Sequence, residues 1–352
     1  MGFTWGLTIN KTILISGITG QDGVFLSSKL IKKFNVVGIV RPGITNSKIQ
    51  KFLLNSNINK ATKINLEEVN LLNQNDTNDI IKKYKPEFFY HLASQSSVEK
   101  SFVENQSTLD YNFFSTKNII DSIKENSKDT KFFFPTSCTI FEGYANLNVD
   151  ENTNPKPMSP YAVSKYKSQE MLKAYNHEYD LNINIGLMFS HESKFRKDNY
   201  FTMTVVNHII RYKYFKKDYI YVGNLNLTRD IGSAEEYVDA IIKINQSNNK
   251  DIFIVSRNDL YKLQHFVNLV CDSLDLNFSV EKNGDELMFI DKSNNKIFLI
   301  SSDKKSRQYE IDGIKGNNTK IFKDLNWEPK KNLEDIVEEM VSFKINEIYK
   351  SL

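Results

Sequence analysis

The chain has 352 residues, which is enough for about two domains at the usual size of roughly 100–200 residues each. Its 46 basic and 43 acidic residues leave a formal charge of +3, too weak a balance to indicate nucleic acid or a membrane surface as a partner. Two cysteines cannot form a disulfide scaffold, and no apolar run reaches the ~18 residues that a membrane span needs. Because residues 1–11 also lack the features of a signal peptide, we expect a soluble, cytoplasmic protein.

The N-terminal half alternates short apolar runs, which favour strands, with amphipathic stretches, which favour helices. The predicted strands are 12–16, 36–40, 87–92, 131–135 and 183–188. The predicted helices are 20–33, 76–83, 108–123 and 160–179. This alternation is typical of a parallel sheet with helices on both faces, so the predicted fold class is a Rossmann-like, doubly wound α/β fold.

After about residue 190 the rhythm changes to helices separated by short strands and loops. A β-hairpin is predicted over residues 288–301, around a turn at Asn294–Asn295. The predicted helices of this part are 201–214, 234–245, 262–274, 318–325 and 333–348. The sequence therefore predicts a dinucleotide-binding Rossmann domain over residues 1–190, to which some later segments return, and a smaller mixed α/β substrate lobe over 191–352.

Three glycines follow the first predicted strand at the spacing GxxGxxG: Gly17, Gly20 and Gly23. Glycine lets the backbone turn tightly and approach a pyrophosphate, and the helix that follows offers unpaired N–H groups at its N-terminus. Three glycines in a loop also occur by chance, but a strand before them and a helix after them favour dinucleotide binding.

The end of the second predicted strand indicates which dinucleotide is bound. An acidic residue at this point would hold the ribose hydroxyls of NAD, whereas the chain has Arg41. A guanidinium suits a 2′-phosphate, so NADP is favoured and NAD remains possible. The alternative is an ordinary solvent-exposed arginine at a strand end.

Tyr161 and Lys165 stand four residues apart at the start of the predicted helix 160–179, so their side chains share one face. A phenol is a poor base because its pKa is about 10, and a nearby ammonium favours the phenolate. The preceding strand ends in hydroxyl residues, and such a hydroxyl can polarise the substrate oxygen that Tyr161 deprotonates. The pattern predicts a proton acceptor beside a nicotinamide; the alternative is a surface pair on an amphipathic helix.

These residues resemble the extended short-chain dehydrogenase/reductase superfamily, and within it the GDP-mannose 4,6-dehydratases. The resemblance runs from about Thr12 to Met340, nearly the whole chain. The segments that carry it are ITGQDG at 18–23, GIVR at 38–41, HLASQSSV at 91–98, SHES at 190–193, GNL at 223–225 with Arg229-Asp230, and the hairpin residues 290–292 with the later Arg307 and Glu310.

The resemblance implies a reaction on a GDP-linked sugar with a nicotinamide cofactor. Hydride leaves sugar C4 while Tyr161 takes the proton of the 4-hydroxyl, and Ser137 assists at that oxygen. The C5 proton and the C6 hydroxyl are then lost as water, and the hydride returns to C6, so the cofactor is regenerated. The family also implies a homodimer or homotetramer that pairs through helices 108–123 and 160–179.

The resemblance also assigns binding residues, and no residue spacing in the sequence indicates a metal site. The cofactor residues that it implies are Gly17, Gly20, Gln21, Asp22, Gly23, Arg41, Asn70, Leu71, Leu92, Ala93, Ser94, Tyr161, Lys165 and His191. The substrate residues that it implies are Ser97, Ser190, Glu192, Arg196, Gly223, Arg229, Arg307 and Glu310.

The chain departs from the family at its catalytic loop. Dehydratases of this type have a glutamate, in TSELYG-like sequence, that removes the C5 proton, whereas here Cys138 or Thr139 takes that position. Threonine is not a base near neutral pH, and cysteine is one only when its pKa is lowered. Glu142 could reach the site only if the loop is one residue longer than supposed.

Oxidation at C4 is therefore expected, and the later steps stay open. Full 4,6-dehydration is the family-level interpretation, with Thr139 counted among the catalytic residues. The alternatives are a C4 dehydrogenase, an epimerase or a keto-sugar reductase acting on a GDP-sugar. A non-enzymatic dinucleotide-binding sensor is a further alternative, but such a chain should have lost the pair of Tyr161 and Lys165.

Overall fold

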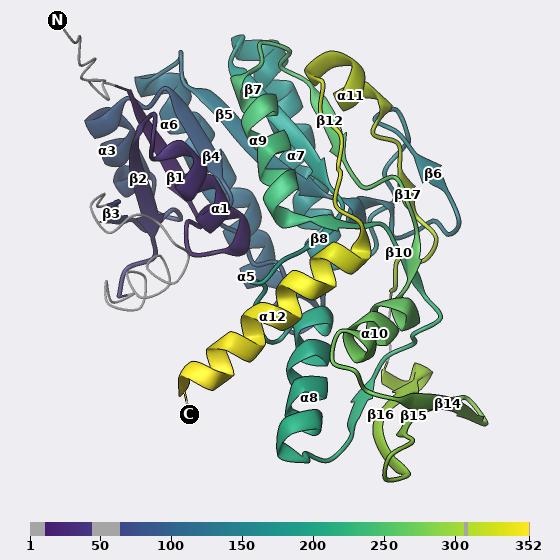
Figure 1. Ribbon diagram of the computed structural model, residues 1–352. Coiled ribbons are helices and arrows are strands. Elements are labelled where there is room, and N and C mark those ends of the chain that lie inside the picture. The colour runs from purple at the N-terminus through teal and green to yellow at the C-terminus, as the bar shows by residue number, and fades with distance from the viewer. Residues whose placement is uncertain (1–10, 44–63, 306–308, 352) are drawn as a thin grey trace, which may run out of the picture. The chain divides into compact units, whose positions relative to one another are not determined.

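The computed structural model describes residues 11–43, 64–305 and 309–351 (Figure 1). Seven strands form one sheet in the order β12-β7-β5-β4-β1-β2-β3, and β1 pairs in parallel with both β2 and β4. The predicted parallel α/β sheet is thus confirmed. The strands are β1 (Thr12–Ser16), β2 (Asn35–Val40), β3 (Asn65–Glu68), β4 (Phe88–His91), β5 (Lys131–Ser137), β7 (Asn182–Met188) and β12 (Ile252–Val255).

The chain divides into two units, each assembled from three segments. The first unit contains Met1–Thr136, Val163–Gly186 and Val238–Ile252, and the second contains Ser137–Ala162, Leu187–Tyr237 and Phe253–Leu352. The predicted domains, 1–190 and 191–352, have a single boundary in the sequence, whereas each unit here consists of three segments. The domain division stays a prediction.

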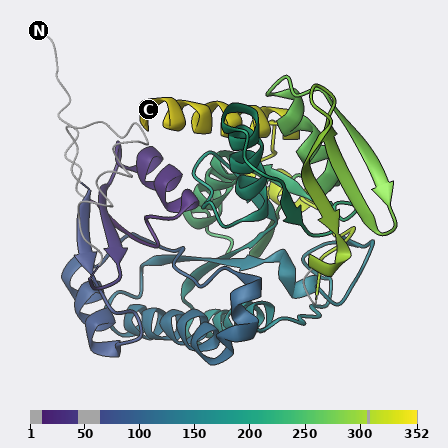
Figure 2. The same ribbon diagram turned by 90° about the horizontal axis from the view of Figure 1, so that it is seen from below.

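Helices cover both faces of the sheet in the first unit. Figures 1 and 2 show α1 on one face and α3 and α6 side by side on the other. Leu14, Phe89 and Phe132 of the strands are buried together with Ile80 and Ile120 of the helices in one apolar core. The helices of this part of the chain are α1 (Gln21–Leu30), α3 (Gln74–Tyr84), α4 (Val98–Val103), α5 (Asn105–Leu109), α6 (Ser115–Asn126), α7 (Pro160–Tyr179) and α9 (Ala234–Gln246).

Residues 108–123 are helical throughout, as predicted, but the helix contains an unpredicted π-helical turn, η1 (Asp110–Phe114), between α5 and α6. Within this turn the buried side chain of Asn112 accepts a hydrogen bond from Gln95 N at 2.8 Å and donates to Ser164 Oγ at 3.0 Å. A π-turn widens the helix by one residue and often serves such a side-chain requirement. These partners are distant in sequence, so periodicity could not reveal the turn.

In the second unit, three helices pack on a small mixed sheet of order β14-β15-β16-β9 (Figure 1). Val206, Phe266, Phe289 and Val337 are buried in this core. The predicted hairpin is confirmed as β15 and β16, and β14 adds a strand that its polar residues concealed. The elements are α8 (Phe201–Phe215), α10 (Leu263–Asp272), α12 (Leu333–Ser351), β9 (Ile220–Val222), β14 (Phe278–Asn283), β15 (Glu286–Asp291) and β16 (Lys296–Ser302).

Short elements complete the second unit. None of the helices in the described ranges is long and apolar enough to cross a membrane. The short elements are the 3₁₀ turns η2 (Cys138–Phe141) and η3 (Asp303–Lys305), the helix α11 (Thr319–Leu325), and the paired strands β6 (Asn148–Val149) with β17 (Lys315–Gly316), β8 (Ser190–Glu192) with β11 (Ile231–Ser233), and β10 (Thr228–Arg229) with β13 (Tyr261–Lys262).

Candidate active site

The glycine loop between β1 and α1 is held by very close backbone approaches. Gly17 has a φ of +74°, and a Cβ on it would lie 2.6 Å from Ala93 N at the end of β4. A Cβ on Gly23 would lie 2.5 Å from Gly17 O. Gly20 N donates to Gly17 O at 2.9 Å, which closes the turn. Only glycine fits Gly17 and Gly23, which accounts for two of the three glycines in the motif.

The third glycine stands at the N-terminus of α1. Gly20 is the N-cap of this helix and offers no side-chain hydrogen bond to the first turn, which begins with Gln21 and Asp22. A ten-residue helix that starts without a side-chain cap presents N–H groups and the positive end of its dipole. This geometry fits the pyrophosphate of a dinucleotide.

The buried side chain of His91 contacts Ser16, the residue directly before Gly17, and so supports the glycine loop. No sequence pattern indicated this role. His91 Nδ1 lies 2.7 Å from Ser16 Oγ, and its Nε2 lies 3.1 Å from Thr116 Oγ1. Ser16 Oγ also accepts from Ala93 N at 3.3 Å. Burial, and then the charge of Lys165, lowers the pKa of His91 to about 3, so the ring is neutral at neutral pH. The network connects Ser16 of β1, His91 of β4 and Thr116 of α6, next to Gly17.

The predicted adenosine end lies where β2 and β3 finish. Arg41 is exposed, and its guanidinium carbon lies 5.9 Å from the ring centre of Tyr111. Glu68 stands nearby, because its Oε2 accepts from Gly43 N at 3.1 Å. Glu68 was not among the predicted residues, although its place at the end of β3 is a readable signal. An arginine and a glutamate therefore both stand at this end of the sheet.

The remaining cofactor residues predicted in the first unit follow the strands β3 and β4. Asn70 forms a turn in which its Oδ1 accepts from Leu72 N at 3.2 Å, while Leu71 is buried. Leu92, Ala93 and Ser94 follow β4 and are half-buried. Their roles stay predictions.

Lys165 is buried in α7, with 4% of its surface exposed. Its Nζ donates to Pro135 O at 2.9 Å and lies 4.7 Å from the ring centre of Phe134, both in β5. Burial lowers the pKa of Lys165 to about 7. The amine therefore changes its charge close to neutrality, which is typical of a functional lysine.

Tyr161 lies one helical turn before Lys165 in α7 and is buried. The side chain of Ser137 lies close enough to act on the pKa of Tyr161, so the predicted tyrosine and serine are neighbours. Burial and then the neighbouring Tyr200 raise the pKa of Tyr161, while the Ser137 side chain and Arg196 act in the opposite direction. Tyr200, which was not predicted from the sequence, is thus part of the surroundings of the phenol.

The loop after Ser137 contains Cys138 and Thr139, the two residues predicted to stand in place of a glutamate. Burial raises the pKa of the Cys138 thiol to about 12, so the thiol stays protonated. Thr139 Oγ1 is buried and has no hydrogen-bond partner among the described residues. Glu142 points to the start of α7, where its Oε2 accepts from Ser159 N at 2.8 Å. The one carboxylate of this loop therefore binds a helix terminus.

Two of the predicted substrate residues form an ion pair beside Tyr200. Arg196 Nε lies 3.2 Å from Glu192 Oε2, and the guanidinium carbon lies 3.9 Å from the ring centre of Tyr200. Glu192 Oε2 also accepts from Thr202 Oγ1 at 2.7 Å. Arg196 and Tyr200 both act on the pKa of Tyr161, so this group lies within electrostatic reach of the phenol.

A second ion pair joins Arg229 and Glu310, whose Nη2 and Oε2 atoms are 2.6 Å apart. Arg229 also lowers the pKa of Cys138, so it lies within electrostatic reach of the catalytic loop. Arg307, predicted to act with this pair, lies outside the described residues.

The other predicted residues have local partners of their own. His191 Nδ1 lies 2.7 Å from Phe189 O and its ring packs on Tyr237, while Gly223 O accepts from Ser301 Oγ at 2.9 Å. In the first unit, Ser97 Oγ accepts from Lys100 N at 3.2 Å and caps α4. Ser190 starts β8, where it stands beside Ile231 of β11. Their predicted roles as ligands of the cofactor or substrate stay predictions.

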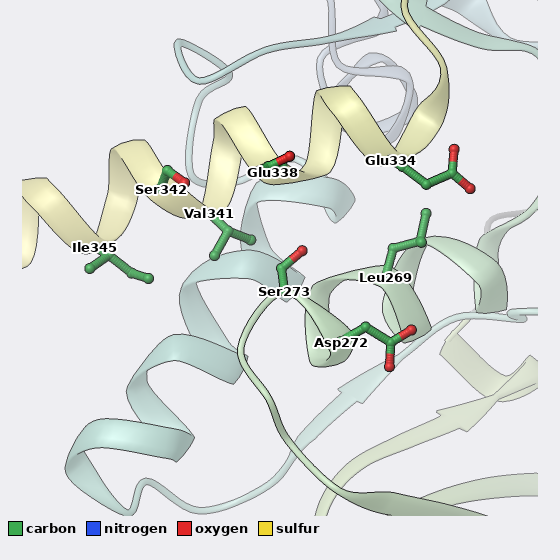
Figure 3. A pocket seen from close by; sticks show the side chains of 8 residues that line it. All are labelled: Leu269, Asp272, Ser273, Glu334, Glu338, Val341, Ser342 and Ile345. Atoms are coloured by element: carbon green, nitrogen blue, oxygen red, sulfur yellow. The ribbon is translucent and has the colours of Figure 1, made fainter.

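A cavity of about 260 Å³ lies elsewhere in the second unit, between α10 and α12 (Figure 3). Leu269, Val341 and Ile345 form its apolar part, and Asp272 and Glu334 stand at its edge. No predicted site residue lines it. Within the described ranges, no cluster of histidine, cysteine or acidic side chains could hold a metal ion.

A family model described as GDP-mannose 4,6 dehydratase matches residues 14–340. The chain belongs to this family. It is 26% identical to the GDP-mannose 4,6 dehydratase of Drosophila melanogaster, over 96% of this chain and 86% of the relative. It is 28% identical to GDP-mannose 4,6 dehydratase 2 of Caenorhabditis elegans, over 95% of this chain and 89% of the relative. The resemblance predicted from the motifs is therefore confirmed, and the protein is an enzyme of the short-chain dehydrogenase/reductase superfamily.

Solved structures share the fold over nearly the whole chain. UDP-glucose 4-epimerase of Thermotoga maritima, with UDP-glucose, superposes with a TM-score of 0.79 at 17% identity, covering 96% of this chain and 99% of its own. DesIV of Streptomyces venezuelae, a dTDP-glucose 4,6-dehydratase with NAD, has a TM-score of 0.77 at 12% identity, covering 95% of this chain and 97% of its own. At these identities the likeness shows the fold alone, and the fold hosts both an epimerase and a dehydratase.

Proposed function

We propose that the enzyme oxidises the C4 hydroxyl of a GDP-linked sugar with a bound nicotinamide dinucleotide. One observation carries the proposal: Tyr161 and Lys165 lie one turn apart at the start of the same helix, and the side chain of Ser137 acts on the pKa of Tyr161. A phenol, a hydroxyl and an amine in this order are the groups needed to remove the proton of an alcohol during hydride loss. The GDP portion is inferred from family membership.

The glycine loop supports the cofactor assignment. Gly17 and Gly23 leave no room for a side chain, and Gly20 opens α1 without a side-chain cap, so a pyrophosphate fits against the backbone N–H groups. When bound, the nicotinamide accepts the hydride from C4. Arg41 supports NADP through its fit to a 2′-phosphate, while Glu68 at the neighbouring strand end is the type of residue that binds the ribose hydroxyls of NAD.

The chain's own residues handle the proton. Ser137 holds the 4-hydroxyl oxygen next to Tyr161, and the deprotonated phenol takes the hydroxyl proton as the C4–H bond breaks. Burial raises the pKa of Tyr161, so its deprotonation needs a compensating positive charge. Lys165, one turn away with a pKa lowered to about 7, supplies this charge in its protonated form and passes its own proton on readily.

The catalytic loop supports chemistry confined to C4. Elimination of water across C5 and C6 requires a base for the C5 proton, and the loop has Cys138 and Thr139 where the family has a glutamate. The Cys138 thiol stays protonated, and Glu142 is held by Ser159. We therefore infer that the hydride is returned to C4 or released with the reduced cofactor, as in an epimerase, reductase or dehydrogenase. Full 4,6-dehydration is the second candidate, which family membership over residues 14–340 favours.

Mass spectrometry of the product tests this proposal directly. After incubation of the purified enzyme with GDP-mannose and NADP, we expect a product of unchanged mass with altered stereochemistry, or a loss of two hydrogens matched by reduced nicotinamide. Loss of one water would contradict the inferred restriction to C4 and support dehydration. Absence of both nicotinamide reduction and any change in the sugar, with every GDP-sugar tried, would instead favour a dinucleotide-binding sensor.

The missing carboxylate can be restored at Thr139. Thr139→Glu is expected to create or increase the loss of water from the sugar, because it returns a base to the position of the family's glutamate. Thr139→Gln has the same size without the basic group and serves as the control. Equal product masses from the two variants would show that another group limits elimination. The homodimer or homotetramer and the cytoplasmic location stay predictions.

A further inference from the structure

Glu142 is a buried carboxylate that binds the two residues directly before the catalytic helix. Only 8% of its surface is exposed. Its Oε2 accepts from Ser159 N at 2.8 Å and lies 3.4 Å from Met158 N, and its Oε1 accepts from Ser159 Oγ at 3.0 Å. Both carboxylate oxygens are therefore engaged at the start of α7. A negative charge at this place is favourable because it faces the positive end of the helix dipole.

Ser159 passes this contact into the first turn of α7. Its hydroxyl donates to Glu142 and accepts from Ala162 N at 3.1 Å, and its surface is fully buried. An N-cap serine fixes one of the helix's free N–H groups, and here a carboxylate fixes the serine rotamer in turn. Ala162 directly follows Tyr161, so the chain of hydrogen bonds ends beside the catalytic phenol.

The backbone fastens the same two segments. Lys156 N donates to Ile140 O at 2.7 Å, and Gly143 N donates to Lys156 O at 2.9 Å. A Cβ on Gly143 would lie 2.4 Å from the Lys156 side chain, so the segments around Gly143 and Lys156 are in close contact. Glu142 stands between these two backbone bonds and extends the connection to Ser159.

The structure assigns to Glu142 the role of a positioning residue, which fixes Tyr161 relative to Ser137 by joining the catalytic loop to the start of α7. The assignment rests on the proposed function, since it concerns the same Tyr161. Ser137 begins the loop, Glu142 ends it, and Tyr161 lies two residues after Ser159. Tyr161 and Ser137, which lie close enough to interact, thus stand at the two ends of a connection to which Glu142 contributes the negative charge. The assignment gives Glu142 no part as the base for the sugar, since both its oxygens are engaged at the start of α7.

Two substitutions of Glu142 separate positioning from base catalysis. Glu142→Gln keeps an oxygen for Ser159 N and an amide for Ser159 Oγ, so it is expected to retain turnover within about threefold. Glu142→Ala removes the connection and is expected to lower kcat about 10- to 100-fold with little change in the KM for the GDP-sugar, as for a small misplacement of reacting groups. A base would instead be lost equally in both variants, and its loss would change the pH profile of kcat.

Hydrogen exchange supplies a readout that does not depend on activity. Amide exchange in the segment 156–165 is expected to accelerate in Glu142→Ala and to stay like that of the wild type in Glu142→Gln. Glu151→Ala is the matched control, because Glu151 also accepts from a backbone N–H of the second unit, Ile254 N at 2.9 Å, away from this loop. It should leave both kcat and the exchange of 156–165 unchanged.

The possible results divide cleanly. Unchanged exchange in Glu142→Ala, or equal loss of kcat in the Gln and Ala variants, would overturn the assignment. If the wild type neither reduces nicotinamide nor changes any GDP-sugar, the proposed function fails, while the exchange data still decide whether Glu142 holds the helix start. Should Glu142→Ala fail to fold, Ser159→Ala breaks the same connection from the other side and is expected to accelerate the same exchange.

Discussion

The glycine loop of the first unit and the catalytic loop of the second unit are built in opposite ways. Gly17 and Gly23 shape the first by leaving side chains out, so that backbone meets backbone. The second depends on side chains, namely Ser137, Ser159 and Glu142, that bond across 17 residues or more of sequence. A backbone constraint is preserved as a spacing of glycines, whereas a side-chain network can exchange members. This difference is consistent with the prediction that the chain departs from its family at the catalytic loop and not at the glycine loop.

Removal of the Tyr161 phenol should have the largest effect on activity. It should leave dinucleotide binding at the glycine loop unchanged. Tyr161→Phe is expected to lower nicotinamide reduction by about 10²–10⁴-fold, because the hydroxyl proton then has no acceptor. Dinucleotide affinity, measured by fluorescence titration, should stay close to that of the wild type. Tyr166→Phe, half-buried on the same helix, is the control and should keep full activity. Undiminished turnover in Tyr161→Phe would contradict the assigned role.

The buried amine of Lys165 should make the stability of the first unit depend on pH. Its pKa is about 7 in the folded protein against an ordinary value of 10.5, so the unfolded chain binds more protons between these values. Wild-type stability should thus rise as the pH increases from about 7 towards 10.5, and this contribution is lost as the pH falls through 7.

Lys165→Met should lack this rise. In urea unfolding, the stability of the variant relative to the wild type is expected to be highest below about pH 7 and to decrease at higher pH. Lys173→Met, at an exposed position of the same helix, should follow the wild type at every pH. A constant difference between Lys165→Met and the wild type would show that the buried amine does not titrate in this range.

A side chain at Gly17 should weaken the cofactor loop more than a side chain at a strained glycine elsewhere. Gly17→Ala adds a Cβ 2.6 Å from Ala93 N to an unfavourable φ of +74°. Gly284 has a φ of +60°, but a Cβ there would meet nothing within 4 Å, so Gly284→Ala carries the backbone cost alone, about 1–2 kcal/mol. Thermal unfolding should show the larger loss for Gly17→Ala, accompanied by weaker dinucleotide binding. Equal losses would mean that the loop moves freely away from β4.

The smallest expected effect concerns cofactor choice at Arg41. Arg41→Ala should weaken NADP by about 10-fold and NAD much less, because only the 2′-phosphate needs the guanidinium. Titration with both dinucleotides measures the ratio, and Lys32→Ala controls for a general loss of positive charge at the surface. If both dinucleotides weaken equally, the phosphate is not read by Arg41, and Glu68 becomes the residue to test for NAD.

Local patterns predicted the parts of the molecule that local forces build. Helix α7 has the predicted bounds Pro160–Tyr179, because a proline at its first position and regular apolar spacing mark it. The π-turn at Asp110–Phe114 escaped prediction since it serves Asn112, whose partners Gln95 and Ser164 are remote.

The site divides in the same manner. Tyr161 and Ser137 were predicted from motifs, and the two side chains are neighbours in the structure. The orientation of Glu142 could not be predicted, because its direction depends on Ser159, 17 residues later. The support that His91 gives to the glycine loop was also missed, since its partners Ser16 and Thr116 lie 75 and 25 residues away.

The protonation state of His91 determines whether its support of the glycine loop changes with pH. Histidine is ordinarily the side chain that senses shifts around neutrality, but with a pKa of about 3 only about one ring in a hundred is protonated at pH 5. The charge of this buried ring, and its contact with Ser16 next to the glycine loop, therefore stay the same through physiological acidification. A pH response near neutrality is instead expected from groups such as Lys165, whose pKa of about 7 lies in that range.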